Sequence, residues 1–365
     1  MKKSKPVILF VSFLFLSPVW SQVSPEVLPD GRVTFRIKAP NADNVTVHGQ
    51  WSGDPVVLAK SGEALWEGTT PEKVAPGVHE YNFMVDGMGT IDSRNRVIKP
   101  QRWPSRSILH IPSDPPAHWD LQDIPHGTVH LHDYYSSSLN TWRKLVVYTP
   151  PGLEKSKNRL PVLYLSHGHS DTQDTWTVDG KAHWIMDSLI HQKLAKPMII
   201  VMPDAHPLSP DSMPRGQYGE ANRQAFAREM VEEIIPFVEA HYKADKRPSM
   251  RAFAGLSMGG GHAFELAFQH HDQFSWIAAF SSSPPKPEYL QASANIKSMN
   301  KDLKLFWIAC GDKDRLLERN EEADVLMEEL GIHHEYTVTV GDDHSWPVWR
   351  RYLVTVLPRF FQDPL

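Results

Sequence analysis

The sequence has almost no cysteine, since Cys310 is the one thiol among 365 residues. A single thiol excludes an intrachain disulfide, a zinc site built from cysteines and a thioredoxin-type pair. The chain also lacks an excess of positive charge: 38 Lys and Arg stand against 43 Asp and Glu, and the formal net charge is −5. This balance provides no general attraction to nucleic acid or to acidic membranes. Nucleic-acid binding is therefore not expected.

Long apolar runs are also missing, except near the start of the chain. Three lysines lie within the first five residues, an apolar run follows from Val7 to Leu16, and Val19-Trp20-Ser21 ends in a small residue. This order is typical of a signal peptide over residues 1–21, and the alternative is an uncleaved anchor. No later run reaches about 18 apolar residues, the length that would span a bilayer. We expect a secreted or periplasmic protein of 365 − 21 = 344 residues with charge −5 − 3 = −8.

The chain length predicts two domains, or one large domain with an attachment. Residues 22–112 have the pattern of a small all-β sandwich, because short alternating segments are separated by turn residues. The segments expected to be strands are Val33–Ile37, Val45–His48 and Val78–Val85. The following residues, 113–125, begin within a proline-rich stretch, and proline favours a semi-stiff linker.

Residues 126–365 change to apolar runs that alternate with helical stretches. The expected buried strands are Leu145–Tyr148, Pro161–Leu165, Met198–Met202, Met250–Ala254, Trp276–Phe280 and Leu303–Ala309. The expected helices are Trp184–Lys193, Ala225–Tyr242, Gly259–His270, Asn320–Leu330 and Trp346–Phe361. Continuous apolar runs are typical of parallel strands, and alternation with helices predicts an α/β sheet. Ligands of such sheets bind at the carboxyl ends of the strands.

The strongest motif is Gly255-Leu256-Ser257-Met258-Gly259, which follows one expected strand and precedes a helix. A G-x-S-x-G sequence in this context predicts the nucleophile turn of an α/β-hydrolase fold, with Ser257 as nucleophile. The glycines on either side leave room for a strained backbone, and the helix directs its amino end at the site of a developing oxyanion.

A serine nucleophile needs a base, and the base needs an acid that fixes its tautomer. In this fold the chain order is serine, acid, histidine. Asp312 and Asp314 both follow the strand that ends at Ala309; Asp314 is favoured, because Asp312 is suited to closing the turn. His344 follows the next expected strand, Glu335–Val340, at the active end of the sheet and is the predicted base.

The oxyanion donors are predicted to be the backbone amides of His169 and Met258. His169 lies in the loop after the strand Pro161–Leu165. The alternative for His167 and His169 is a metal-binding His-x-His pair, which has no further ligand nearby in the sequence. Cys310 ends an apolar strand, where a thiol is usually inert. No metal and no organic cofactor is expected.

Aromatic side chains of the first domain have two interpretations. They are suited to stacking on sugar rings, and a sandwich this small also needs large side chains in its core. The residues in question are Trp51, Trp66, Tyr81 and Trp103.

The region from Ile124 to Phe361 resembles the esterase D-like family, carbohydrate esterase family 1, which includes feruloyl and acetyl xylan esterases. The segments that carry the resemblance are IPHGTV at Ile124, RKLVVYTPPG at Arg143, PVLYLSHGHSDTQDTW at Pro161, KPMIIVMPD at Lys196, IIPFVEAHY at Ile234, RAFAGLSMGGGHAF at Arg251, ACGDKD at Ala309 and GDDHSWPVWR at Gly341. The resemblance implies Ser257, Asp314 and His344 as the triad. It departs at His169, where relatives often carry Gly or an aliphatic residue.

The first domain resembles the immunoglobulin-like module related to family 48 carbohydrate-binding modules. Together the two resemblances imply an esterase that removes feruloyl groups from plant polysaccharide such as arabinoxylan, with an esterified polysaccharide or oligosaccharide as its partner. The alternatives are an acetyl xylan esterase, a ferric-siderophore esterase, and a carbohydrate-binding protein without catalysis. An acyltransferase is chemically adjacent.

Overall fold

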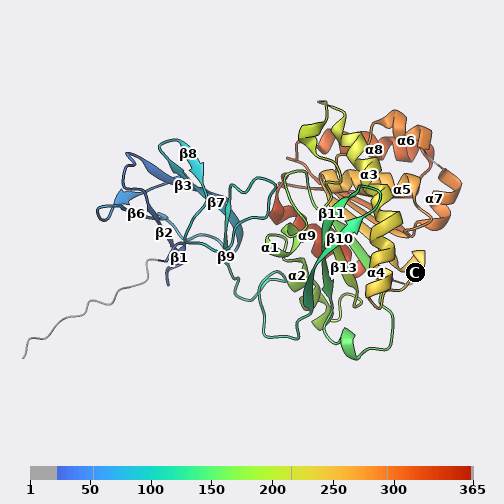
Figure 1. Ribbon diagram of the computed structural model, residues 1–365, viewed down its shortest axis with the longest axis horizontal. Helices are drawn as coiled ribbons and strands as arrows, with labels where there is room; N and C mark the ends of the chain where they lie inside the picture. Colours follow the sequence, from blue (N-terminus) through green and yellow to red (C-terminus); the bar gives the residue numbers. More distant parts are fainter. Residues whose placement is uncertain (1–22, 52, 215, 294, 363–365) are drawn as a thin grey trace, which may run out of the picture.

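The computed structural model describes residues 23–51, 53–214, 216–293 and 295–362. Figure 1 shows a small all-β region, coloured blue to cyan, beside a larger region in which helices surround a central sheet. The predicted signal peptide, residues 1–21, lies outside the described residues. None of the described helices is long and apolar enough to cross a membrane.

The small region consists of two antiparallel sheets around one core. The first sheet has the order β1 (Glu26–Val27), β2 (Val33–Lys38), β6 (Leu65–Thr69), β5 (Ala59–Lys60). The second has the order β4 (Val56–Val57), β3 (Val45–Gly49), β7 (Gly77–Val85), β8 (Met88–Thr90), and β9 (Ser107–Ile111) also pairs with β7. Side chains alternate across each strand, so that Phe35 and Val47 from the two sheets meet in the same apolar cluster. The predicted sandwich is therefore present, and its immunoglobulin-like topology stays a prediction.

The aromatic residues of this region divide between core and surface. Tyr81 and Trp66 are buried in the apolar cluster, and Trp51 packs on its edge with its ring 5.4 Å from that of Phe35. Trp103 is 60% exposed and lies under the guanidinium of Arg102. The core interpretation holds for Tyr81 and Trp66, and a surface role stays open for Trp103.

The large region is built on an eight-stranded sheet. Its order is β10 (Thr128–Ser136), β11 (Thr141–Thr149), β13 (Ile199–Pro203), β12 (Val162–Ser166), β14 (Arg251–Leu256), β15 (Trp276–Phe280), β16 (Leu305–Gly311), β17 (Glu335–Thr339). The strands from β13 to β17 are parallel, whereas β10 and β11 are antiparallel additions at one edge. The expected strand at Leu145–Tyr148 is thus present but antiparallel, and the sheet is mixed. The strand order reverses at β12, and ligand sites form at the carboxyl ends of strands at such a point.

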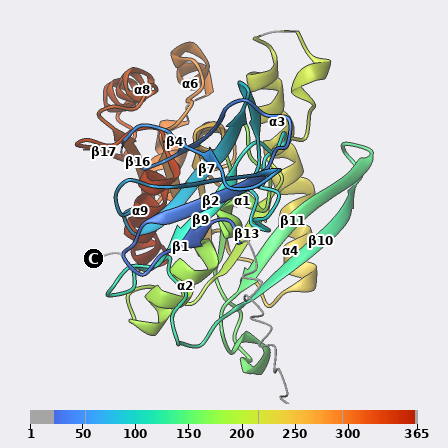
Figure 2. The same cartoon turned by 90° about the vertical axis from the view of Figure 1, so that its left-hand side faces the viewer.

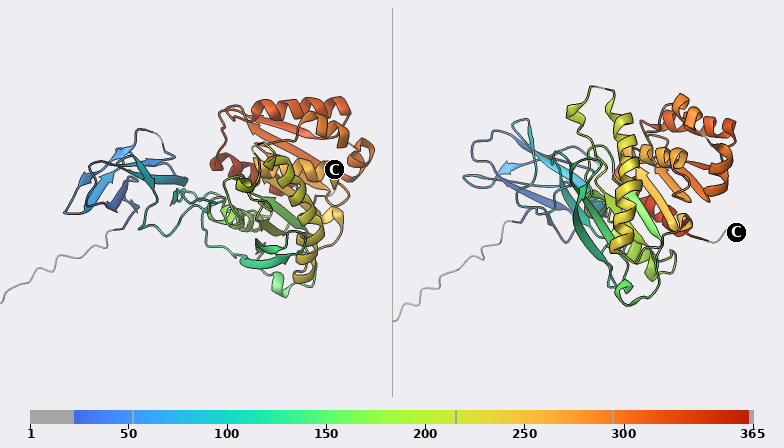
Figure 3. Two further views of the ribbon diagram at one scale, coloured as in Figure 1. Left: turned by 45° about the horizontal axis from the view of Figure 1, so that its top comes forward. Right: turned by 45° about the vertical axis from the view of Figure 1, so that its right-hand side comes forward.

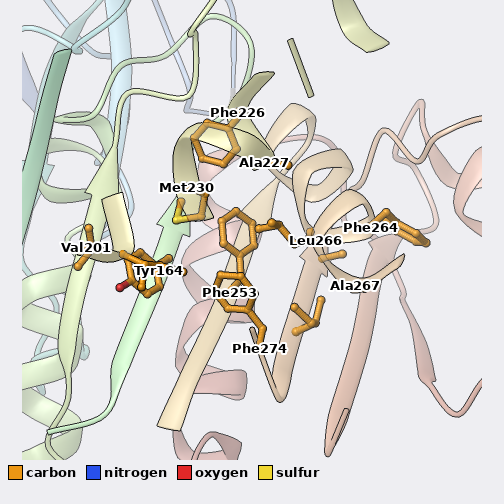
Figure 4. Close-up of a cluster of buried hydrophobic side chains, with 14 of the residues drawn as sticks. Tyr164, Val201, Phe226, Ala227, Met230, Phe253, Phe264, Leu266, Ala267 and Phe274 are labelled. Atoms are coloured by element: carbon orange, nitrogen blue, oxygen red, sulfur yellow. The ribbon is translucent and has the colours of Figure 1, made fainter. Parts of the chain in front are cut away.

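Helices cover both faces of this sheet, as Figures 2 and 3 show. The helices are α1 (Thr175–Val178), α2 (Ala182–His191), α3 (Tyr218–Glu229), α4 (Ile235–His241), α5 (Met258–Gln269), α6 (Pro287–Ser293), α7 (Ile296–Asp302), α8 (Leu317–Leu330) and α9 (Trp346–Val356). One face packs against α3, α4, α5 and α8, the other against α2 and α9. Figure 4 shows the first of these cores, where Phe253 of β14 meets Phe226 of α3 and Phe264 lies on α5.

Two expected helices have different bounds. The helix expected at Ala225–Tyr242 begins earlier, at Tyr218, and contains a π-helical turn, Met230–Ile234, before α4. The helix expected to reach Phe361 ends at Val356, because Pro358 has no amide to continue the hydrogen-bonded series. The short helices α1, α6 and α7 were not expected from the sequence pattern.

Candidate active site

Ser257 lies at the turn between β14 and α5, at the carboxyl edge of the sheet. Its backbone has φ 52° and ψ −111°, a strained conformation for a residue with a side chain. The neighbouring glycines allow this turn, because a Cβ at Gly255 would lie 2.3 Å from the carbonyl oxygen of Gly259. A Cβ at Gly259 would lie 2.7 Å from that of Ser166, at the end of β12. The turn therefore presses the amino end of α5 against the loop that follows β12.

Three side chains that are far apart in the sequence form a continuous hydrogen-bonded series. The hydroxyl of Ser257 lies 3.0 Å from Nε2 of His344, to which it donates. Nδ1 of His344 lies 2.9 Å from both carboxylate oxygens of Asp314. Asp314 and Ser257 are 5% and 8% exposed. The structure thus brings together the three residues that the sequence predicts as nucleophile, base and acid.

The carboxylate of Asp314 is held in its ionised form. Burial raises the pKa of Asp314, but hydrogen bonds from His344, from the amide of Leu316 and from the hydroxyl of Ser281 outweigh burial and lower it. Ser281 in turn accepts a hydrogen bond from the indole of Trp349 at 3.0 Å. An ionised carboxylate in this position stabilises a protonated imidazole at His344.

The other candidate acid points elsewhere. The side chain of Asp312 is exposed, and its Oδ1 accepts a hydrogen bond of 2.7 Å from the amide of Gly341. Asp312 therefore ties the turn after β16 to the end of β17, whereas Asp314 contacts His344. The sequence does not indicate the roles of Ser281, which donates a hydrogen bond to Asp314, and of Trp349, which donates to Ser281. The available signal is that Ser281 directly follows the apolar strand β15.

The predicted oxyanion donors lie on either side of Ser257. Met258 is the first residue of α5, and its amide and that of His169 donate to no acceptor within the described residues. Gly168 packs against the nucleophile, because a Cβ there would lie 3.7 Å from that of Ser257. Free amides at a helix amino end and in an adjoining loop are suited to binding an oxyanion.

The imidazole of His167 is fully used within the protein. Its Nδ1 donates to the carbonyl of Gly168 at 2.8 Å, and its Nε2 accepts from the amide of Ala205 at 2.9 Å. Neither nitrogen is left for a metal ion, which contradicts the His-x-His alternative. In the part of the chain that the structure describes, no group of three His, Cys, Asp or Glu side chains is arranged to hold a metal.

Two cavities open beside Ser257. The first, of about 690 Å³, is lined by the first turns of α3, by the segment after β15 and by the start of α8. The rings of His169, Tyr218 and Tyr289 lie on its wall. The second, of about 460 Å³, lies between the two regions of the chain, with Gln50, Glu80 and Lys99 on one side and Ser257 and His344 on the other. Ser257, the predicted nucleophile, therefore borders both cavities.

The thiol of Cys310 is not part of this arrangement. Cys310 is completely buried in β16, and burial followed by the nearby charge of Asp314 raises its pKa to about 12. A buried, protonated thiol is a poor nucleophile.

Comparison with known proteins identifies the family of the chain. Residues 136–360 match the model of the Esterase family. A curated relative from Xylanibacter ruminicola, named "Endo-1,4-beta-xylanase/feruloyl esterase", is 31% identical over 350 residues, which are 93% of this chain and 46% of the relative. The chain thus spans about half the length of that relative.

Two solved structures show the extent of the similarity. A ferulic acid esterase is 28% identical with a TM-score of 0.55, over 65% of this chain and 98% of its own. The enterobactin esterase of Shigella flexneri is 18% identical with a TM-score of 0.64, over 91% of this chain and 93% of its own, and so shares the fold of both regions. The chain belongs to the Esterase family.

Proposed function

We propose that the protein is an exported serine esterase that removes feruloyl and related hydroxycinnamoyl groups from plant cell-wall polysaccharide such as arabinoxylan. The observation that carries the chemistry is the hydrogen-bonded series from Ser257 through His344 to Asp314 beside an open cavity. The similarity to a relative named xylanase/feruloyl esterase, along 93% of the chain, supports the acyl group. We take the N-terminal sandwich to be the predicted immunoglobulin-like module.

The reaction proceeds through an acyl-enzyme. Ser257 Oγ attacks the ester carbonyl carbon while His344 Nε2 takes its proton, and Asp314 stabilises the resulting imidazolium. The amides of His169 and Met258 bind the oxyanion of the tetrahedral intermediate. When the carbon–oxygen bond to the alcohol breaks, His344 returns the proton to the departing oxygen. Water then repeats the sequence on the acyl-enzyme and releases the acid.

The volume and lining of the larger cavity fit an aromatic acyl group. Its volume of about 690 Å³ is within the range typical of small-molecule sites. Tyr218, Tyr289 and Pro284 provide flat apolar surfaces near Ser257. The polar cavity between the two regions then remains for the sugar that leaves.

The direct test replaces the nucleophile. Ser257→Ala is expected to abolish hydrolysis of methyl ferulate and of feruloylated arabinoxylan oligosaccharide while the circular dichroism spectrum and melting temperature stay unchanged. Activity of the variant within tenfold of the wild type would overturn the assignment of Ser257. Binding of the polysaccharide by wild type with no ester hydrolysed would instead support the non-catalytic alternative.

A second candidate function is favoured by the charge of the larger cavity. Its wall carries Arg223, Lys286, Arg315 and Arg319 against Glu220 and Glu288. Arg223 is paired with Glu265 at 2.9 Å, outside that lining, but Arg315 forms no ion pair with any described residue. A net positive wall suits an anionic substrate such as the catecholate ester of a ferric siderophore.

One panel of substrates separates these candidates. Methyl ferulate, acetylated xylan and a catechol trilactone with its iron are hydrolysed in parallel by wild type. Our proposal expects the highest kcat/KM with the ferulate. A preference of tenfold or more for acetylated xylan or for the trilactone would replace the hydroxycinnamoyl assignment by that function.

A further inference from the structure

A short segment of the N-terminal region lies against the loop that carries the predicted oxyanion donor His169. The amide of Arg102 donates to the carbonyl of Ser170 at 3.0 Å, and Gln101 pairs with Asp171 in an antiparallel bridge. One residue earlier, the carbonyl of Pro100 accepts a hydrogen bond of 2.6 Å from the hydroxyl of Thr175. The segment 99–102 is therefore bound to the loop 168–171 and, through Pro100, to the first residue of α1.

Lys99 anchors this segment to the catalytic region through buried charge. Its Nζ lies 2.7 Å from a carboxylate oxygen of Glu80, 3.8 Å from one of Asp171 and 3.9 Å from one of Asp179. Lys99 is 6% exposed and Asp171 2% exposed. The charges here belong to one group, the junction cluster, which consists of Glu80, Lys99, Asp171, Asp179 and Arg350.

Asp171 depends on that cation. Burial raises the pKa of Asp171, and the charge of Lys99 acts against burial. No other cationic side chain within the described residues lies within 4.0 Å of its carboxylate. Removing one partner of a buried ion pair leaves an uncompensated charge, which forces the carboxylate to take up a proton or move.

Movement of Asp171 would reach the nucleophile within a few residues. The amide of Asp171 donates to the carbonyl of Gly168 at 3.2 Å and closes a tight turn around His169. Gly168 packs on Ser257 at the other end of this turn. The amide of His169 is therefore held between a contact with Ser257 and the contact with the N-terminal region.

We propose that Lys99 is a positioning residue for catalysis, through which the N-terminal region holds the oxyanion loop 168–171 in register with Ser257. The inference rests on the proposed acyl-enzyme function. A purely structural role for Lys99 would predict a different result: the substitution would lower stability, but the folded enzyme would keep its kcat and its affinity for a transition-state analogue.

The test substitutes Lys99→Met in the full chain and uses small substrates, methyl ferulate and p-nitrophenyl acetate. A displacement of about 1 Å in a catalytic group can cost up to about 100-fold in rate. We expect kcat to fall about 10- to 100-fold with KM within twofold. In phenylboronic acid the boron accepts a lone pair of Ser257 Oγ, the hydroxyl proton passes to His344 Nε2, and a tetrahedral boronate anion forms. This anion resembles the tetrahedral intermediate, so the inhibition constant should rise in parallel with the loss of kcat.

Two further variants separate the effect of charge at position 99 from a general loss of folding. Lys99→Arg retains the charge and should keep most of the activity. Thr175→Val removes the hydrogen bond to Pro100 and leaves all buried ions paired. It therefore weakens the contact between the N-terminal segment and the catalytic region without changing any charge. We expect kcat to fall severalfold with KM unchanged. Lys144→Met is the matched control. It removes an exposed lysine on β11 that pairs with Asp133 on β10, in a part of the chain that does not contact the junction cluster.

The outcomes distinguish the inference from the proposed function. Hydrolysis by Ser257→Ala would overturn the proposed function, and the inference with it. If Ser257→Ala is inactive but Lys99→Met and Thr175→Val are folded and keep the wild-type kcat, the proposed function stands and the inference alone is overturned. A loss of stability in Lys99→Met that lowers the apparent kcat only in proportion to the unfolded fraction, with KM and the boronate inhibition constant unchanged, would also overturn it.

Discussion

Two clusters of buried ionisable side chains meet at the cavity between the two regions, and they are built differently. In the triad, Ser257, His344 and Asp314 are joined by hydrogen bonds of 2.9 to 3.0 Å. In the junction cluster, Lys99 lies at 3.8 and 3.9 Å from two of its three carboxylates. One oxygen of Asp179 accepts no hydrogen bond within the described residues. The triad is directional, whereas the junction cluster is held mainly by charge.

The difference follows from what each cluster has to do. In the proposed mechanism, proton transfer between Ser257 and His344 needs short and aligned contacts, and a single carboxylate is enough to orient the imidazole. Holding the two regions together needs attraction over a wider area, and three carboxylates with two cations provide it. Buried charges are costly to desolvate, so the junction cluster is sensitive to the loss of any partner.

The largest expected effect is on the triad. Asp314→Asn keeps the shape of the side chain but removes its charge and favours the wrong tautomer of His344. In a Ser-His-Asp triad such a change lowers kcat by roughly 10⁴-fold. We expect this loss in methyl ferulate hydrolysis, with the melting temperature within a few degrees of wild type. A loss below tenfold would mean that Asp314 does not serve as the acid.

The junction cluster should respond in stability. Arg350 is 2% exposed and donates to Asp179 at 3.1 Å and to the carbonyl of Val78 across the junction, also at 3.1 Å. Arg350→Met leaves Asp179 buried with less cationic charge, a change that costs about 3–5 kcal/mol. Urea unfolding followed by tryptophan fluorescence measures it.

A double substitution checks the cause. Arg350→Met combined with Asp179→Leu removes both charges of the pair, and replacement of a buried pair by apolar side chains is often close to neutral. The double variant should therefore be more stable than Arg350→Met alone. If the two variants unfold at the same urea concentration, the loss comes from packing and the charge argument is wrong.

A smaller effect is expected in the pH dependence of stability. Burial raises the pKa of Asp179 to about 7, although the charge of Arg350 acts in the opposite direction. In the unfolded chain the same group ionises near pH 4. Between these values the folded protein binds more protons, so the free energy of unfolding falls as pH rises, by up to about 1.4 kcal/mol per unit.

Asp179→Asn removes this titration and supplies the control. Its free energy of unfolding should change less between pH 4 and 7 than that of wild type. As pH rises over this range, the wild type should therefore lose stability relative to Asp179→Asn. Parallel curves would show that Asp179 keeps an ordinary pKa in the folded protein.

The triad was accessible to sequence reasoning, and the junction cluster was not. Ser257 sits in a local motif that needs a strand, a turn and a helix, and the chain order then selects Asp314 and His344. Lys99 and Asp171 are 72 positions apart and belong to different regions, so no local pattern connects them. Their contact depends on how two finished cores pack against one another.

The fold shows the same division. The central strand β14 and its neighbour β15 have apolar side chains on both faces, so each is a continuous apolar run that the sequence alone predicts to be a buried strand. The sequence does not predict the edge strand β10, because it lacks the continuous apolar run of a buried strand: most of its side chains are exposed or half-buried, and Leu131 is 74% exposed. The helices α6 and α7 each bury a single apolar side chain, Leu290 and Met299, and this is too little periodicity to indicate a helix.

The smallest expected effect compares the two aspartates that the sequence left in competition. Asp312 accepts one hydrogen bond from the amide of Gly341 at the protein surface, and an asparagine oxygen can accept the same bond. Asp312→Asn should therefore keep kcat within twofold of wild type and change the melting temperature little. Because Asp312 and Asp314 share one turn, a large loss from Asp312→Asn would show that the turn, rather than the carboxylate facing His344, determines activity.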